Sequence, residues 1–327
     1  MNSRPEAASP RRAGLHRFAL ATAVATLFLI VAGGLVTSTE SGLSVPDWPL
    51  SYGRLMPPMV GGILYEHGHR MVATTVGLLT VILAIWLART EPRRWVRGLG
   101  WAALGAVVAQ GVLGGLTVIF LLPTAISVAH ACLAQTFFCL VVTLAVVTSR
   151  RWREGAPAVP GAVFRIGAWA VASVWIQLLI GAVMRHDKAG LAIPDFPLAL
   201  GRVVPPIHSF PVAIHFAHRA WAVVTAASVV ACLVQAVRSR RPGLVRTGVV
   251  LVSIVCVQIA LGAATVLTRK AVPVATAHVA TGALLLGATL AFTLGSRRRI
   301  ASPARDAAPR LETASSPGPA ARKKALA

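Results

Sequence analysis

Charged residues are scarce in this sequence, and acidic residues are the scarcest of them. Only 13% of the 327 residues are charged, and 10 Asp and Glu stand against 32 Lys and Arg. Soluble domains carry about 25% charged residues, so the composition excludes an ordinary soluble domain. The apolar stretches also lack the alternation of polar and apolar residues that spanning β-strands require.

Cysteine is rare as well. The chain has four, and all of them fall within apolar stretches: Cys132, Cys139, Cys232 and Cys256. None lies in a segment predicted to be outside the membrane, so an external disulfide is excluded. We expect these residues to pack as small apolar side chains.

Hydrophobic residues make up 56% of the chain and gather in eight separate blocks. Each block has about 20 residues, enough to cross about 30 Å of hydrocarbon as a helix. The predicted fold is therefore an all-α polytopic membrane protein with eight transmembrane helices. These are predicted at Arg17–Thr37, Ile63–Leu87, Gly98–Val118, Thr124–Val147, Phe164–Met184, Pro211–Val237, Thr247–Leu267 and Val274–Leu294.

The net charge of +22 follows membrane topology. Of the 32 Lys and Arg, 24 fall on the same side as the N-terminus, counting Arg17 and Arg165 at the inner ends of their predicted helices. Two, Arg70 and Arg219, lie deeper within predicted helices, and six lie in the opposite loops: Arg54, Arg185, Lys188, Arg202, Arg269 and Lys270. This is the positive-inside pattern, so we expect cytoplasmic termini, contact with anionic membrane lipid and no nucleic-acid partner. The first apolar block is too long for a signal peptide, which predicts a retained helix in a bacterial plasma membrane.

An internal repeat divides the chain. Residues 42–58 match residues 190–206 at a shift of 148, and both contain Pro-Asp-aromatic-Pro-Leu. We therefore predict two tandem four-helix bundles, related by a pseudo-two-fold axis along the membrane normal. The predicted divisions are a cytoplasmic N-terminal segment (1–16), an N-terminal half (17–150), a C-terminal half (151–296) and a disordered basic tail (297–327).

Six of the nine histidines fall in the outer parts of even-numbered predicted helices, where an imidazole is costly unless it has a function. Two imidazoles facing each other across a bundle can hold a metal macrocycle, and imidazole is a standard ligand of haem iron. Interhelical hydrogen bonds and a proton path are the alternatives. Zinc fits less well, because the second half has no acidic residue in its helices. The repeat-related pairs are His69 with His130 and His218 with His278; His67 and His215 complete the six, and His16, His186 and His208 are expected to be solvated.

Glycines on the odd-numbered predicted helices are expected to make room for a flat macrocycle. Close packing between helices is the alternative reading. The residues concerned are Gly33, Gly34, Gly111, Gly114, Gly115, Gly181 and Gly262.

The two halves differ chemically at the start of their second helices. Glu66 stands three residues before His69, whereas the second half has His215 at the corresponding offset. A carboxylate at this depth is expected to move protons, unless it forms an ion pair with Arg70. This asymmetry suggests that one half does chemistry and the other a simpler task, such as electron transfer. Arg70 and Arg219 are expected to meet haem propionates or to snorkel to the membrane surface.

Together these features resemble the haem A synthase family. The resemblance covers nearly all of residues 15–296 and includes the eight helices and the tandem repeat. It implies an enzyme that oxidises the C8 methyl group of haem O to a formyl group by successive hydroxylation, giving haem A for cytochrome c oxidase. The motifs that carry it are Pro46-Asp47-Trp48-Pro49-Leu50, Glu66-x-x-His69-Arg70, His130, His218-Arg219 and His278.

The resemblance also implies a role for each residue. His218 and His278 would be the axial ligands of a bound haem b, whereas His69 and His130 would hold the substrate haem O. Glu66 would be the essential acidic residue, shuttling a proton or stabilising a cationic intermediate. Because the substrate is insoluble, we expect haem O synthase as a partner, together with an electron donor for which a quinol is one candidate.

One departure from the family pattern concerns the outer loops. Many bacterial members carry a cysteine pair in the first outer loop, where this chain has Ser44 and Ser51. The second loop has Ala192 and Ala199 at the related positions. A thiol-based step or a loop disulfide is therefore excluded for this chain.

Two other functions stay open from the sequence. A non-catalytic dihaem b electron carrier would need neither Glu66 nor two unequal halves. A transporter is suggested only by the repeat and the intramembrane charges.

Overall fold

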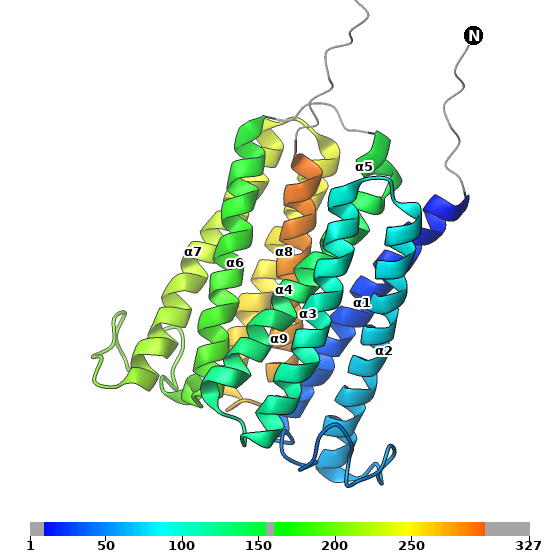
Figure 1. Cartoon of the computed structure of the whole chain (residues 1–327). Helices are drawn as coiled ribbons and strands as arrows, with labels where there is room; N and C mark the ends of the chain where they lie inside the picture. Colours follow the sequence, from blue (N-terminus) through cyan, green and yellow to red (C-terminus); the bar gives the residue numbers. More distant parts are fainter. Residues whose placement is uncertain (1–9, 155–159, 298–327) are drawn as a thin grey trace, which may run out of the picture.

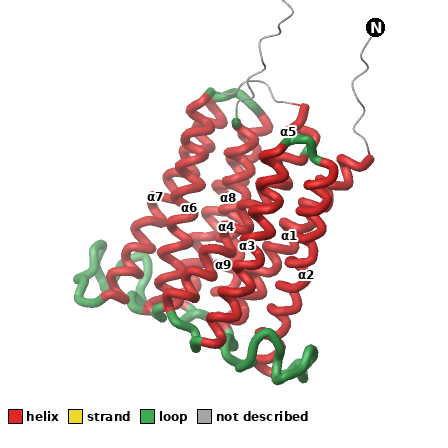
Figure 2. Tube along the Cα trace, viewed as in Figure 1, coloured by secondary structure: helices red, strands yellow, loops and turns green. Residues whose placement is uncertain are grey.

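The computed structural model describes residues 10–154 and 160–297, and helices account for most of these residues (Figure 1). Eight helices are long and apolar enough to cross a membrane, and no strand occurs within the described ranges (Figure 2). The all-α class and the eight spans are thus confirmed. The elements are α1 (Pro10–Ser38), α2 (Gly61–Thr90), α3 (Arg94–Ile119), α4 (Thr124–Thr148), the short α5 (Arg150–Glu154), α6 (Gly161–His186), the 3-10 helix η1 (Ala189–Leu191), α7 (Phe210–Arg238), α8 (Pro242–Leu267) and α9 (Val272–Ser296).

The helices extend beyond the predicted apolar blocks, and two expectations for histidines are wrong for this reason. Helix α1 begins at Pro10, so His16 lies within it, and its Nδ1 is 2.9 Å from the carbonyl oxygen of Ala145. Helix α6 runs to His186, which places both Arg185 and His186 in its last turn and only partly exposed. Hydropathy marks the apolar part of a helix and misses its polar hydrogen-bonded ends.

The long helices pack as two rings joined along one face. Helices α1 to α4 contact one another in ring order, as do α6 to α9, and α9 also packs against α1 and α4, while α4 packs against α6. Helices α4 and α9 are therefore the most enclosed. The symmetry axis and the limits of the two halves stay predictions, and the expected disordered tail lies, apart from its first residue, outside the described residues.

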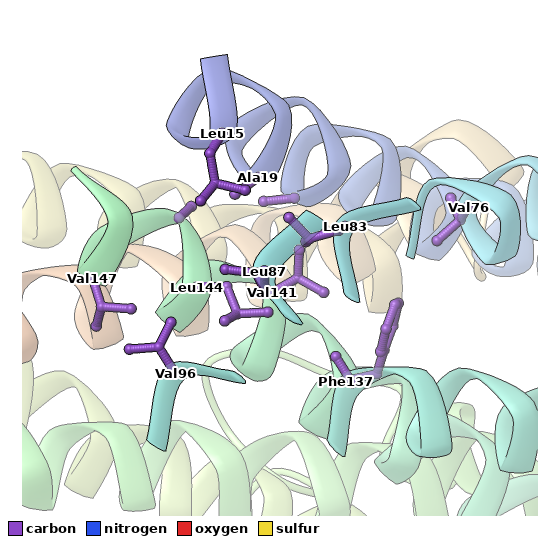
Figure 3. Close-up of a cluster of buried hydrophobic side chains, with 13 residues drawn as sticks. Leu15, Ala19, Val76, Leu83, Leu87, Val96, Phe137, Val141, Leu144 and Val147 are labelled. Atoms are coloured by element: carbon purple, nitrogen blue, oxygen red, sulfur yellow. The ribbon is translucent and has the colours of Figure 1, made fainter. Parts of the chain in front are cut away.

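Each ring has its own cluster of buried apolar side chains. Figure 3 shows the first cluster, in which Leu83 and Leu87 of α2 pack with Phe137 and Leu144 of α4. The second cluster joins α6 to α9 in the same way. Association of helices within a bilayer depends on such packing, because lipid gives no hydrophobic driving force between them.

Two long loops, 39–60 and 187–209, lie at the same end of the bundle (Figure 1). We call this the loop end. The histidines of interest occupy the parts of the even-numbered predicted helices nearest to it, whereas the apolar clusters centre further along those helices. All four cysteines lie in helices and are free thiols, as predicted. Cys232 is buried, whereas Cys256 is exposed on the surface of α8 and, contrary to expectation, does not pack in the interior.

Candidate functional site

Four histidines share one structural arrangement. Each lies on α2, α4, α7 or α9 with its imidazole against a glycine of the preceding helix. A Cβ added at that glycine would lie 3.0–3.2 Å from the imidazole Cε1, so a larger residue would displace the ring. The glycines therefore make room for the imidazoles themselves. The four contacts are Gly33 with His69, Gly114 with His130, Gly181 with His218 and Gly262 with His278.

The remaining glycines of the predicted set have other neighbours. A Cβ at Gly34 would contact Val279 on α9, which fits the close-packing interpretation, and Gly115 lies beneath the indole ring of Trp48 from the first loop. Nothing lies within 4 Å of a Cβ at Gly111.

A glutamine accompanies three of the four histidines, always four residues before the glycine. The Gln177 amide nitrogen lies 3.2 Å from both ring nitrogens of His218. The corresponding distances to Nε2 are 3.3 Å from Gln110 to His130 and 3.5 Å from Gln258 to His278. In the first half Leu29 occupies this position beside His69. This Gln-x-x-x-Gly spacing is visible in the sequence, although it was not among the predicted site features.

The spacing of the second histidine pair fits a macrocyclic metal ligand. The ring centres of His218 and His278 are 6.4 Å apart. Two imidazoles that bind one metal from opposite sides have centres roughly 6–6.5 Å apart, because each metal–nitrogen bond is about 2 Å. In the first bundle, His69 and His130 lie against Gly33 and Gly114, the glycines at the repeat-related positions.

The chemistry of the donors agrees with that fit. Nδ1 of His69, His130 and His278 is buried without a hydrogen-bond partner, which is a costly state that calls for a ligand or a rearrangement. No group of three or more His, Cys, Asp or Glu able to hold a bare metal ion occurs among residues 10–154 and 160–297. Two imidazoles per site therefore suit haem iron better than zinc.

Glu66 and His215 occupy corresponding positions in the two halves, and each contacts a backbone nitrogen of the long loop of its own half. Both side chains are buried, at 4% and 2% exposure. Oε2 of Glu66 accepts the backbone N–H of Val45 at 2.8 Å, and Nδ1 of His215 lies 3.2 Å from the backbone nitrogen of Ile193. Each residue thus fastens the loop of its own half, but only Glu66 brings a carboxylate.

Arg70 and Arg219 fasten the same loops. Arg70 donates to the carbonyl oxygens of Asp47, Leu50 and Val45, and forms a 2.7 Å ion pair with Glu66. The ion pair considered as an alternative for Glu66 is therefore present. Arg219 donates to the carbonyl oxygens of Leu198 and Ile193, both at 2.9 Å. The predicted propionate contacts of the two arginines stay predictions.

The loop tips are built alike. The Asp47 carboxylate accepts the N–H groups of Tyr52 and Gly53, and Asp195 accepts those of Leu200 and Gly201. These backbone hydrogen bonds lower the pKa of both carboxyls below the usual 3.8, and the N–H of the glycine makes the largest contribution in each loop. Ser51, at a position where relatives were expected to carry cysteine, lies with its Oγ 2.8 Å from Nδ1 of the buried His67.

The structure thus brings together the predicted residues of each half. His69, Glu66 and Arg70 share the first turns of α2, and His130 lies in the corresponding part of α4. His218 and His278 face each other in the second half. Arg185, expected in an outer loop, lies instead in the last turn of α6, one turn beyond Gly181, which contacts His218. No pattern in the sequence marks it as a neighbour of the sites.

Comparison with known proteins agrees with this arrangement. The profile of the family described as cytochrome oxidase assembly protein (COX15-CtaA) matches residues 16–62 and 62–290. The haem A synthase of Halalkalibacterium halodurans is 32% identical over 282 residues, which cover 81% of this chain and 92% of the relative. The haem A synthase of Rhizorhabdus wittichii is 29% identical, covering 88% and 95% of the two chains. The matched regions contain all four paired histidines, and the chain belongs to the COX15-CtaA family of cytochrome oxidase assembly proteins.

Proposed function

We propose that this protein is a haem A synthase, a membrane oxidoreductase that converts the C8 methyl group of haem O to the formyl group of haem A. The observation that carries the proposal is the pairing of two similar histidine sites with unequal neighbours. Both halves present two imidazoles, yet only the first places a carboxylate, Glu66, three residues before a ligand.

In the proposed conversion the methyl carbon is hydroxylated twice, and the gem-diol then loses water to leave the formyl group. Each hydroxylation balances with one molecule of O2, two electrons from the donor and two protons: one oxygen atom enters the C–H bond and the other leaves as water. The substrate haem O is held in the first half by His69 and His130. Small residues leave room for these imidazoles, since Gly33 and Gly114 contact their Cε1 atoms. Loop 39–60 lies at the same end of the bundle as these imidazoles, and its Trp48 packs on Gly115 of α3.

Glu66 is the residue assigned to proton movement. It is the only acidic side chain within the eight spans. Uptake of a proton by its carboxylate would weaken the ion pair with Arg70, and Arg70 also donates to three carbonyl oxygens of the first loop. Proton transfer at Glu66 is therefore coupled to the contacts that hold this loop.

The second half provides a simpler site. His218 and His278 would hold haem b, which supplies one-electron transfer when bound. Their imidazoles are positioned by Gly181 and Gly262 and by the adjacent Gln177. His215 fastens the second loop without contributing a carboxylate.

The cellular setting follows from the spans and the charge pattern. The protein is a multi-pass membrane protein, and the excess of Lys and Arg on one side supports a bacterial plasma membrane location with both termini in the cytoplasm. Haem O is itself lipophilic, so transfer from haem O synthase within the bilayer is the expected route of supply. An electron donor, for example a quinol, completes the set of partners.

Pigment analysis of a deletion strain tests the proposal. Loss of the protein should abolish haem A and accumulate haem O or its hydroxylated form. A pyridine haemochrome spectrum of the purified protein should show b-type haem. Normal haem A in the deletion strain would refute the synthase function.

A non-catalytic dihaem b carrier is the second candidate, favoured by the likeness of the two histidine pairs. Glu66→Ala separates the two functions, because a carrier would keep its electron-transfer activity while the synthase would lose its product. Arg202→Ala, at an exposed loop residue, is the control for expression and folding.

A further inference from the structure

Arg185 is a cation without an acidic partner at the junction between the two halves. It lies in the last turn of α6, and its Nη2 donates to the carbonyl oxygen of Gly34 at 2.9 Å and to Oγ of Ser38 at 2.8 Å, both on α1. No acidic side chain pairs with it anywhere in residues 10–154 or 160–297. Arg185 is only partly exposed, so an anion bound to it would be screened less by water than an anion at the open surface.

The position relates Arg185 to the second pair of histidines. Gly181, which contacts His218, lies four residues earlier on α6 and so on the same helix face, one turn further from the loop end. His278 lies on α9, two residues after Thr276. Nearby, Thr276 of α9 donates to Ser38 at 3.0 Å. Arg185 therefore lies just beyond both ligands of the second site, where α1, α6 and α9 meet.

The guanidinium keeps donors for a ligand. A guanidinium has five N–H groups, and the two contacts with α1 use only those of Nη2. Nη1 and Nε make no hydrogen bond within the described chain, and their planar fork suits a carboxylate. Arg219, by contrast, has both terminal nitrogens engaged by loop carbonyls.

We propose that Arg185 binds a carboxylate side chain of the haem held between His218 and His278, and so attaches that haem to α1 of the opposite half. This inference rests on the proposed function, which supplies the haem. The first half has no equivalent, because Thr37 stands at the related position and donates back to Gly33 within its own helix. The device belongs to the second site alone.

Haem exchange and redox titration of the purified holoprotein test the proposal. In Arg185→Gln, transfer of haem from the second site to excess apomyoglobin should be about ten-fold faster or more. The midpoint potential of the retained haem should fall, since removal of a nearby positive charge favours the ferric form. Arg202→Gln, at an exposed arginine of the same end, is the matched control.

Two comparisons separate carboxylate binding from a purely structural role. Ser38→Ala removes one contact of Arg185 with α1 but keeps its charge, and should leave the midpoint potential unchanged. Reconstitution with haem and with its dimethyl ester should show that wild type prefers the diacid, and that Arg185→Gln loses this preference. If Arg185→Gln does not fold, Arg185→Lys serves in its place with a smaller loss of preference.

Unchanged exchange, potential and diacid preference in Arg185→Gln would overturn the proposal. Equal loss of the diacid and the ester would do so as well, because it would indicate a role in helix packing alone. The proposed function fails by a different result, namely absence of any haem spectrum in the wild-type protein.

Discussion

The two halves of the molecule share a skeleton and differ in a few polar side chains. In both halves, two imidazoles lie against glycines of the preceding helices. In both, an arginine near the start of a helix also donates hydrogen bonds to carbonyl oxygens of the Pro-Asp-aromatic-Pro loop. The placement of the imidazoles is therefore common to both halves. The chemistry of each half depends on the side chains that differ beside them. The differing positions are Glu66 against His215, Leu29 against Gln177, and Thr37 against Arg185.

Replacement of one histidine in each half should have the largest effect and should separate the roles of the two halves. His278→Ala should abolish the haem b absorbance and leave the protein folded, because the apolar clusters do not involve this residue. His69→Ala should stop haem A formation and leave most of the haem b in place. Absorption spectra and haem A yields of the two variants provide the measurement. An intact spectrum in His278→Ala would show that the division of labour is wrong.

Exchange of Glu66 for the residue of the other half should have the next largest effect. Glu66→His should lower turnover by roughly 100-fold or more, which is the scale of acid–base catalysis. The loop should stay in place, since His215 lies within hydrogen-bonding distance of the equivalent backbone nitrogen. Haem A yield and limited proteolysis of loop 39–60 measure the two effects separately. Full activity in Glu66→His would exclude a chemical role for the carboxylate.

The difference between Leu29 in the first half and Gln177 in the second should change the rate at which each half releases haem. Second-shell partners of metal-bound histidines are worth about 10–100-fold in affinity. We therefore expect Leu29→Gln to slow release of haem from the first half, and Gln177→Leu to speed release from the second, each by about ten-fold. Stopped-flow transfer to apomyoglobin gives both rates, and Leu29→Met is the apolar control. Equal rates in Leu29→Gln and Leu29→Met would remove position 29 from the explanation.

A methyl group beside a ligand should have the smallest effect. In Gly262→Ala the new Cβ would lie 3.1 Å from Cε1 of His278, and overpacking of this kind costs about 1–3 kcal/mol. Haem affinity of the second site should fall roughly five-fold or more. Gly111→Ala is the matched control on α3, because nothing lies within 4 Å of its Cβ. A similar loss in both variants would point to helix packing in place of the imidazole.

The sequence was sufficient to predict the spans and to relate the histidines of the two halves, whose roles as haem ligands stay predictions. Eight apolar blocks predicted eight helices, since length and hydropathy alone decide whether a helix can cross a bilayer. The shift of 148 or 149 residues linked His69 to His218 and His130 to His278, because duplicated segments fold alike. These predictions depend on periodicity and repetition, which survive in a single sequence.

The polar contacts could not be predicted in the same way. Whether Glu66 faces Arg70, the loop or a ligand depends on side-chain directions, and the structure shows that it binds both Arg70 and Val45. Arg185 looked like a loop residue because hydropathy ends before the helix does. Its contact with α1 spans about 150 residues of sequence, and one sequence carries no signal for such a pair.

The apolar clusters lie further along the helices than the histidines, and this separation bears on how the protein matures. Leu83, Leu87 and Phe137 can pack in the newly inserted chain without any pigment. The helix bundle can therefore fold in the bilayer before haem binds. Haem would then bind in the last step of biogenesis, after diffusing through the lipid to a site that has already formed.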